Sequence, residues 1–166
     1  IASMGDAAER YLKLHTASRL LKWSMEKFRE TKQGPMLTKA SAIFNGLTLN
    51  SFSRLLVDAD EATPRLFGIR PSGEQVDVAG MSEGSRDQLY LALRLAALEL
   101  QVEQGLSMPL IADDLFINFD DRRTEAGLKV LGELSRKMQV VFLTHHEHLV
   151  PLAREVLGVD LNVVQL

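Results

Sequence analysis

The sequence has no cysteine among its 166 residues, only five prolines and an aromatic content of 6%. Without cysteine the chain can form neither disulfides nor thiolate metal sites, which fits a reducing compartment. It also has no apolar run near the roughly 20 residues that span a bilayer. The first residues, IASMGDAAER, lack the basic end and apolar stretch of a signal peptide. We therefore expect a cytoplasmic protein without a membrane partner.

The composition that remains is that of a soluble globular protein, 46% hydrophobic and 25% charged, with enough residues for one core of moderate size. The net charge of −3 is unevenly distributed. Residues 1–39 carry eight basic and four acidic side chains, whereas the remainder carries eleven and eighteen. The basic part is most simply a solvated helix face, and a phosphate-binding surface is the alternative.

An N-terminal helix is predicted over residues 1–33, because neither proline nor glycine interrupts residues 6–33 and Gly34-Pro35 follows them. Its apolar residues recur at alternating spacings of three and four, which is a heptad seam typical of a coiled-coil arm. A plain amphipathic helix is the alternative. Because the seam reaches the first residues, we expect the chain to begin partway along a longer arm. The seam consists of Met4, Ala7, Tyr11, Leu14, Ser18, Leu21, Met25 and Phe28.

Residues 34–166 form the second predicted domain and begin with an amphipathic helix over 36–47. Short strands are then predicted at 55–57, 65–70 and 75–78. The last two are joined by Pro71-Ser-Gly-Glu74, a favourable turn sequence. This segment predicts a small antiparallel flap.

Beyond the flap, a long helix from 85 to 105 is apolar nearly all round and should be buried. Strands and helices then alternate to the end of the chain, which predicts an α/β fold: a parallel sheet with flanking helices. The expected strands are 110–112, 140–143 and 161–166, and the expected helices are 122–137 and 147–157.

Polar side chains follow two of these strands, where the strands end. Asp113 and Asp114 come directly after the first, and Thr144 and His145 directly after the second. Carboxyl ends of parallel strands lie at one edge of a sheet, so these groups should be close together. Adjacent carboxylates there are costly unless they face a cation, a donor or water. The aspartates could also cap a helix and the histidine could be a loop residue; together the four predict a polar site.

The segment MSEGSRDQ, residues 81–88, places small polar residues at the start of the long apolar helix. Ser82 and Gly84 would offer an anion a hydroxyl, closely approachable backbone amides and the positive end of the helix dipole. Arg86 would add charge, although a salt bridge to a nearby carboxylate is the plainer role.

These segments resemble, in order and spacing, the motifs of ABC-type ATPases of the SMC- and SbcC-related class. MSEGS resembles the signature motif, PLIADD the Walker B strand, INFD at 117–120 the D-loop and LTHH the switch-histidine segment. The run SEGSRDQLYLALRLA is similar to that of YhaN-like P-loop ATPases. The resemblance covers residues 9–166 and implies the C-terminal lobe of an ATPase head.

The resemblance implies a role for each strand-end residue. Asp113 would hold Mg²⁺ through a coordinated water. Asp114 would position or deprotonate the attacking water, and His145 would contact the γ-phosphate of ATP. Asp114 departs from the glutamate of the wider family; its shorter side chain retracts the carboxylate and makes slow hydrolysis plausible. The residues implied in ATP binding, several of them toward ATP on an opposing protomer, are Ser82, Glu83, Gly84, Ser85, Arg86, Asp120 and Thr144.

No GxxxxGK[ST] phosphate loop is present, so the resemblance implies two further partners: an N-terminal P-loop lobe of the same protein and a second head in a homodimer. It also suggests DNA repair or chromosome maintenance, with a metallophosphoesterase nuclease and non-specific DNA as candidate partners. Asp120 would lie at the dimer seam and couple the two sites.

Two alternatives come from other classes of protein. One is a non-catalytic dimerisation module with a degenerate nucleotide site. The other is a metal-dependent hydrolase that uses the Asp-His cluster, with His145 and His148 on one helix face. The full set of candidate ligands for that hydrolase is Asp113, Asp114, His145, His146 and His148.

Overall fold

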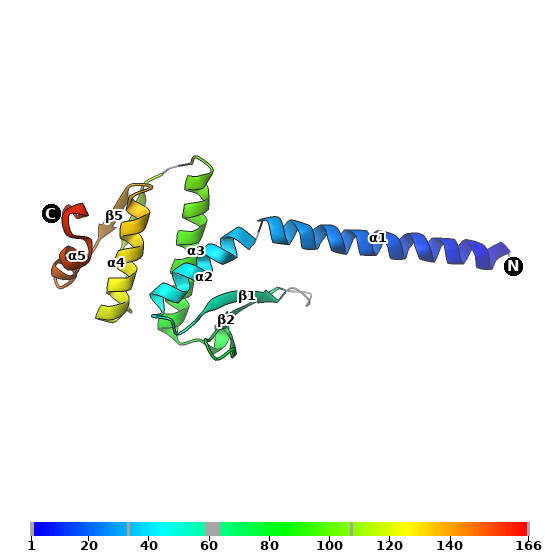
Figure 1. Cartoon of the computed structure of the whole chain (residues 1–166), viewed down its shortest axis with the longest axis horizontal. Coiled ribbons are helices and arrows are strands. Elements are labelled where there is room, and N and C mark those ends of the chain that lie inside the picture. The colour runs from blue at the N-terminus through cyan, green and yellow to red at the C-terminus, as the bar shows by residue number, and fades with distance from the viewer. Residues whose placement is uncertain (1, 33, 59–63, 107, 166) are drawn as a thin grey trace. The chain divides into compact units, whose positions relative to one another are not determined.

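The computed structural model describes residues 2–32, 34–58, 64–106 and 108–165, and the chain divides into two compact units, Ile1–Pro35 and Met36–Leu166. The first unit is one helix, α1 (Ala2–Lys32), drawn in blue in Figure 1. Its seam residues Tyr11, Leu14 and Phe28 are 67%, 64% and 64% exposed. The expected helix is therefore present with its seam open to solvent, and its pairing in a coiled coil stays a prediction.

The second unit begins within helix α2 (Gly34–Leu47). Three strands follow: β1 (Arg54–Asp58), β2 (Arg65–Ile69) and β3 (Gln75–Asp77). Both strand pairs are antiparallel, in the order β1-β2-β3. The turn between β2 and β3 is closed by the amide of Arg70, which donates to the carbonyl of Glu74 at 2.9 Å. This confirms the antiparallel flap.

Helix α3 (Glu83–Glu103) follows a short 3₁₀ turn, η1 (Val78–Gly80). One broad face is buried, with Leu89 at 0% and Leu95 at 2% exposure, whereas Tyr90 on the other side is 55% exposed. The expected burial of this helix is confirmed for the broad face, and Tyr90 marks a narrower face that meets solvent. Gln88 is fully buried, and its Nε2 donates to the carbonyl of Leu47 at 3.0 Å, which fastens α3 to the end of α2.

The core of this unit lies between α2, α3 and α4 (Asp121–Ser135), with contributions from the flap. Complete burial of one aliphatic or aromatic side chain contributes about 1.5–3 kcal/mol, so these contacts dominate the packing. Figure 1 shows α3 and α4 running side by side. Central members of the cluster are Ala40, Phe44, Leu47, Phe52, Leu89, Ala92, Leu95, Leu128, Leu131 and Leu134.

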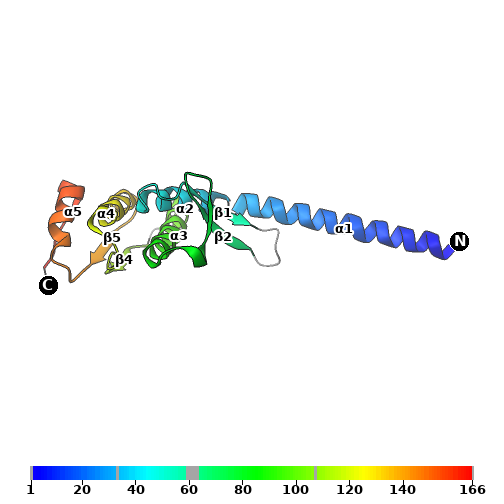
Figure 2. The same cartoon turned by 90° about the horizontal axis from the view of Figure 1, so that it is seen from below.

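A two-stranded parallel sheet carries the C-terminal third. Strand β4 (Leu110–Asp113) pairs with β5 (Val140–Leu143) in a register that sets Asp113 opposite Leu143. Helix α4 makes the crossover, and both strands lie beside it in Figure 2. One face of the sheet buries Ala112, to 2% exposure, whereas the other leaves Ile111 66% and Leu143 42% exposed. The α/β class with a parallel sheet and flanking helices is confirmed.

The third parallel strand, expected at 161–166, was wrong for the described residues 161–165. Helix α5 (Leu149–Leu157) ends in a 3₁₀ turn, η2 (Gly158–Asp160), and the residues that follow have no strand conformation. An alternating apolar pattern makes a strand only when a neighbouring strand supplies the hydrogen-bonding ladder, and β4 and β5 pair only with each other in the described chain.

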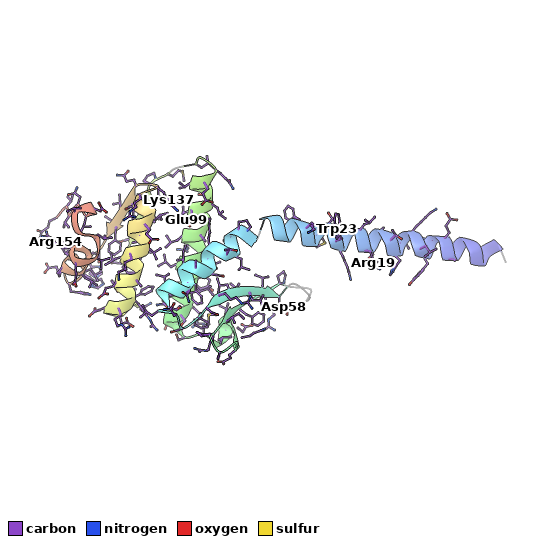
Figure 3. All side chains as sticks on the ribbon, viewed as in Figure 1. Arg19, Trp23, Asp58, Glu99, Lys137 and Arg154 are labelled. Atoms are coloured by element: carbon purple, nitrogen blue, oxygen red, sulfur yellow. The ribbon has the colours of Figure 1, made fainter. Side chains whose placement is uncertain are left out.

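An ion-pair network joins the helices at one end. Glu99 on α3 contacts the Nζ of Lys39 at 3.4 Å and that of Lys137 at 3.0 Å. Figure 3 labels Glu99 and Lys137 as neighbours beyond the end of α4. Burial alone would raise the pKa of Glu99, but the positive charges of Lys137 and Lys39 outweigh burial, and the pKa is lowered.

No helix in the described part of the chain has the length and apolarity to cross a membrane.

Candidate functional site

The end of β4 delivers the two predicted carboxylates. Asp113 is the last residue of the strand and is exposed, and Asp114 is half-buried just beyond it. Asp114 has a φ of 43°, in the left-handed region that costs most non-glycine residues energy but that aspartate tolerates better. Its amide donates to the carbonyl of Leu143 at 2.9 Å, so the neighbouring strand holds this conformation. The backbone thereby turns the Asp114 carboxylate toward the end of β5.

Asp114 and His145 meet at this edge of the sheet, as the sequence predicted. The Nδ1 of His145 lies 2.6 Å from Oδ2 of Asp114. The Thr144 hydroxyl lowers the pKa of Asp114, burial opposes this effect, and His145 lowers the pKa further. The carboxyl group is therefore ionised at neutral pH and accepts the Nδ1–H of His145. Such a pairing fixes the orientation of an imidazole ring, and it leaves Nε2 of His145 free to face a ligand.

The structure shows neither helix capping by the two aspartates nor a helix face shared by His145 and His148. The aspartate pair does not cap α4: the N-cap is Asp120, whose Oδ1 accepts from the amide of Arg123 at 2.9 Å. His145 and His148 do not share a helix face, because α5 begins only at Leu149 and His148 is its N-cap residue. That part of the hydrolase alternative was wrong.

The signature-like turn lies at the N-terminus of α3, and Ser82 is its N-cap. The Oγ of Ser82 accepts from the amide of Ser85 at 3.3 Å and lies 2.9 Å from the Ser85 hydroxyl. Glu83 stands in the first turn, where a negative charge favours the helix dipole. Within the part of the chain that the structure describes, Arg86 forms no ion pair, so the salt bridge considered for it is not found.

Asn118, in the D-loop-like segment, is a positioning residue that the sequence did not single out. Its Nδ2 donates to Oδ2 of Asp87 on α3 at 2.9 Å, and its carbonyl lies near Gly84. A Cβ built on Gly84 would lie 3.7 Å from that carbonyl oxygen, an ordinary contact distance. The signature-like turn and the D-loop-like segment therefore form one surface, and no close contact with the described residues requires a glycine at Gly84.

The predicted site residues fall into two groups. Asp114, Thr144 and His145 are gathered at the ends of β4 and β5, next to Asp113. Residues 82–86 and Asp120 lie at the N-termini of α3 and α4. Across residues 2–32, 34–58, 64–106 and 108–165, no hydrogen bond or ion pair joins the two groups.

His146 is a further residue that sequence reasoning did not assign to the nucleotide site. Its ring centroid lies 4.0 Å from that of His145 and 5.6 Å from that of His148, so three imidazoles follow β5 in close succession. The amide of His146 donates to the Thr144 hydroxyl at 3.1 Å. The consecutive histidines in the sequence were the signal that could have indicated its position.

Two curated bacterial and archaeal proteins are among the sequence relatives of this chain. The chain is 26% identical to the protein YhaN of Bacillus subtilis over 145 residues, 86% of this chain and 15% of that protein. It is 32% identical to the DNA double-strand break repair Rad50 ATPase of Pyrococcus abyssi over 124 residues, 74% of this chain and 14% of that protein. The chain thus spans about a seventh of the length of these relatives. No family model matches it.

Solved structures share the fold. A structure from work on ATP-driven dimerisation and DNA-stimulated activation of SMC ATPases superimposes with a TM-score of 0.61, covers 77% of each chain and is 16% identical. The arrangement of small parallel sheet and flanking helices is that of the C-terminal lobe of an SMC head.

Proposed function

We propose, from its likeness in sequence and fold to the C-terminal region of an SMC-type ABC ATPase head, that the chain provides half of a composite ATP-hydrolysing site. The observation that carries the proposal is the contact of 2.6 Å between Asp114 and His145 at the ends of two parallel strands. ATP would be held on a P-loop lobe of the same protein, and the site would close when two heads meet. Similarity to Rad50 supports a role in DNA repair or chromosome maintenance.

The Asp114 carboxylate is ionised and anchored, as a group that orients or deprotonates a water must be. His145 is held through Nδ1 and is 70% exposed, so its Nε2 would be directed at the γ-phosphate. Thr144 supports the pair. Asp113 carries an exposed carboxylate at the strand end, which suits a hydrated Mg²⁺, and that ion would neutralise charge on the phosphates.

The start of α3 would supply the opposing wall of the site in a partner head. Its exposed Ser82, first-turn amides and helix dipole are suited to a phosphate. Gly84 supports this interpretation, because a β-carbon there would meet no atom of the described residues closer than 3.7 Å. The glycine is then explained by the close approach of a ligand, and Arg86, without an ion pair in the described chain, would add a positive charge.

The open face of the sheet supports the need for a second lobe. Ile111 on β4 and Leu143 on β5 are 66% and 42% exposed. Leu143 is paired with Asp113 of the site, and Ile111 lies two residues before Asp113 on the same strand. Large apolar side chains side by side on a sheet face are costly in water. The P-loop lobe would cover this face and, in doing so, bring bound ATP to Asp114 and His145.

The experiment is Mg²⁺-dependent ATP hydrolysis by the full-length protein, compared with Asp114→Asn. Loss of a positioned base lowers the rate by roughly 10²–10⁴-fold. Asp160→Asn, on the exposed turn η2, is a matched control that should leave the rate unchanged. If the full-length protein binds ATP without turnover and Asp114→Asn changes nothing, the chain is the non-catalytic dimerisation module instead.

The remaining partners follow from the same proposal. A second copy of the head and, by analogy with SbcC-type proteins, a metallophosphoesterase nuclease are the expected protein partners. Non-specific DNA would meet the basic residues of 1–39, among which Arg19 on α1 is labelled in Figure 3. ATPase stimulation by DNA of unrelated sequences, weakening with salt, would support this part of the proposal.

A further inference from the structure

The residues after β4 and β5 contain more ligand atoms than the proposed ATPase chemistry uses. One carboxylate oxygen of Asp114 and one ring nitrogen each of His145 and His146 lie within 4.8 Å of one another. The proposed nucleotide chemistry gives His146 no role. The ring nitrogen of His146 beside the ionised carboxylate of Asp114 therefore needs another explanation.

Two atoms of this cluster lack hydrogen bonds. Within the described part of the chain, Oδ1 of Asp114 and Nε2 of His146 are shielded from solvent and have no partner. The Thr144 hydroxyl accepts from the amide of His146 and lowers the pKa of Asp114, yet it is not within hydrogen-bonding geometry of Oδ1. A polar atom that is shielded from solvent and has no hydrogen-bond partner is destabilising. Both are atoms that bind metals, one a carboxylate oxygen and one an imidazole nitrogen.

We infer that Asp114, His145 and His146 form a binding site for a divalent transition-metal ion of the Zn²⁺ class. Two imidazoles and one carboxylate are a typical three-ligand set for zinc, with a fourth position left for water. Mg²⁺ prefers oxygen ligands in octahedral geometry, so this donor set selects against the ion that ATP hydrolysis uses. The site is built from this chain alone and does not rest on the proposed ATPase function.

The geometry requires only a local adjustment. Ligand atoms around a tetrahedral zinc ion, with bonds of about 2.1 Å, lie about 3.4 Å apart. The present separations, up to 4.8 Å, must contract by up to about 1.4 Å. The Oδ2 atom of Asp114 and the Nδ1 atom of His145, now 2.6 Å apart, must instead move away from each other. The His145 side chain is 70% exposed, and to bind through Nδ1 it must give up its bond to Asp114: the Nδ1 proton moves to Nε2 and the Nδ1 lone pair faces the ion.

This site has a functional consequence that does rest on the proposed function. A zinc ion on Asp114 and His145 would occupy the two groups assigned to the attacking water and the γ-phosphate. ATP hydrolysis and zinc binding would then exclude one another, so zinc would inhibit the full-length enzyme. His146 would determine this inhibition without taking part in hydrolysis.

The first experiment measures Zn²⁺ binding to this chain in competition with a chromogenic chelator. We expect one ion per chain, and we expect His146→Ala to weaken its binding by at least about tenfold, since loss of outer partners alone costs 10–100-fold. His148→Ala is the matched control, because its ring lies 5.6 Å from that of His146 but outside the cluster. Unchanged affinity in His146→Ala, or an equal loss in His148→Ala, would overturn the assignment.

A second measurement guards against a variant that fails to fold. Co²⁺ bound in tetrahedral geometry absorbs strongly in the visible range, so wild type should colour on Co²⁺ addition and His146→Gln, which keeps the side-chain bulk, should not. Thermal unfolding without metal should be the same for wild type and both His146 variants. Octahedral, weakly absorbing Co²⁺ in wild type would show a surface ion and sink the proposal.

Inhibition is tested separately in the full-length protein. Micromolar Zn²⁺ should lower the hydrolysis rate of wild type but not that of His146→Ala, whose rate without zinc should match wild type. If the protein never hydrolyses ATP, the ATPase proposal fails while the binding data still decide the metal site. If wild type and His146→Ala are inhibited equally, the inhibitory consequence is wrong.

Discussion

Replacing Gly84 by alanine separates a functional reason for this glycine from a structural one. Gly84 lies in the first turn of α3, and a Cβ there would be 3.7 Å from the carbonyl oxygen of Asn118. Alanine is the better helix former by about 0.5–1 kcal/mol, and no contact with the described residues opposes it. We therefore expect Gly84→Ala to fold with equal or slightly higher stability.

The expected gain in stability determines how small a shift of the unfolding midpoint the assay must resolve. For a chain of this size, 1 kcal/mol corresponds to roughly 2–4 °C in the unfolding midpoint, so the expected rise is about 1–4 °C. Thermal unfolding of this chain, followed by circular dichroism, measures it. Gly46→Ala in α2 is the matched control for helix propensity, since a Cβ there meets nothing within 4 Å.

Gly127→Ala provides the opposite control. A Cβ at Gly127 on α4 would lie 2.3 Å from Cε1 of Phe116, whose buried ring packs between Phe119 and Phe142. Overpacking of this kind costs about 1–3 kcal/mol. Gly127→Ala should therefore unfold at a lower temperature, which shows that the assay detects a glycine with a structural role.

The functional half uses the full-length protein. Gly84→Ala should lose at least about tenfold in ATP-dependent head association, equivalent to 1.4 kcal/mol, because the methyl group stands where a phosphate must approach the backbone. Gly46→Ala should associate as wild type does. The reasoning is refuted if Gly84→Ala destabilises this chain by more than about 1 kcal/mol, or if it folds well and associates normally.

Three further predictions concern single side chains. Ser82→Ala removes the N-cap of α3 and should lower the free energy of unfolding by about 1 kcal/mol in urea titration; no loss would mean that the cap bond is not formed in solution. Asp114→Asn should abolish ATP turnover in the full-length protein while leaving its nucleotide affinity intact, as measured by fluorescent-nucleotide binding; a weakened affinity would indicate a different role. Glu99→Gln should cost roughly 1 kcal/mol at neutral pH by loss of its pairs with Lys39 and Lys137. Because the pKa of Glu99 is lowered from 4.5, its stabilisation is complete above that value and is lost as the pH falls through the folded pKa, so the difference between wild type and variant should shrink progressively as the pH is lowered below 4.5.

The sequence predicted those elements whose boundaries are marked by local chemistry. The flap followed from short apolar runs and the turn at Pro71-Ser-Gly-Glu74, and the structure has all three strands. Helix α3 starts at Glu83 rather than 85, because the Ser82 side chain caps it and takes in one more half-turn. Helix α5 starts later than expected, at Leu149, since the three histidines before it form a turn.

Elements that depend on distant partners could not be predicted in this way. The apolar alternation at 161–165 looks like a strand, but a strand needs a neighbour, and neither β4 nor β5 pairs with it in the described chain. The exposed face of α3 at Tyr90 was equally hidden, because apolar composition does not say which face meets solvent.

The candidate site also has features that could be predicted from the sequence and features that could not. The meeting of Asp114 with His145 could be predicted, because parallel strands end at one edge of the sheet. The left-handed backbone of Asp114 and the bond from Asn118 to Asp87 could not, since both depend on the register of segments far apart in the sequence. The chemical roles assigned to the site residues stay predictions until turnover is measured.

Contacts within the described chain explain why some positions carry a polar or small residue and leave other positions unexplained. The unexplained positions indicate where another molecule would bind. Asp120 caps α4, Gln88 fastens α3 to α2, and Gly127 makes room for the ring of Phe116. No comparable partner within the described chain explains Gly84 or the open sheet face at Ile111. A folded chain retains such costly features when another molecule covers them, so the partners of this lobe should be sought at the start of α3 and on the exposed face of its sheet.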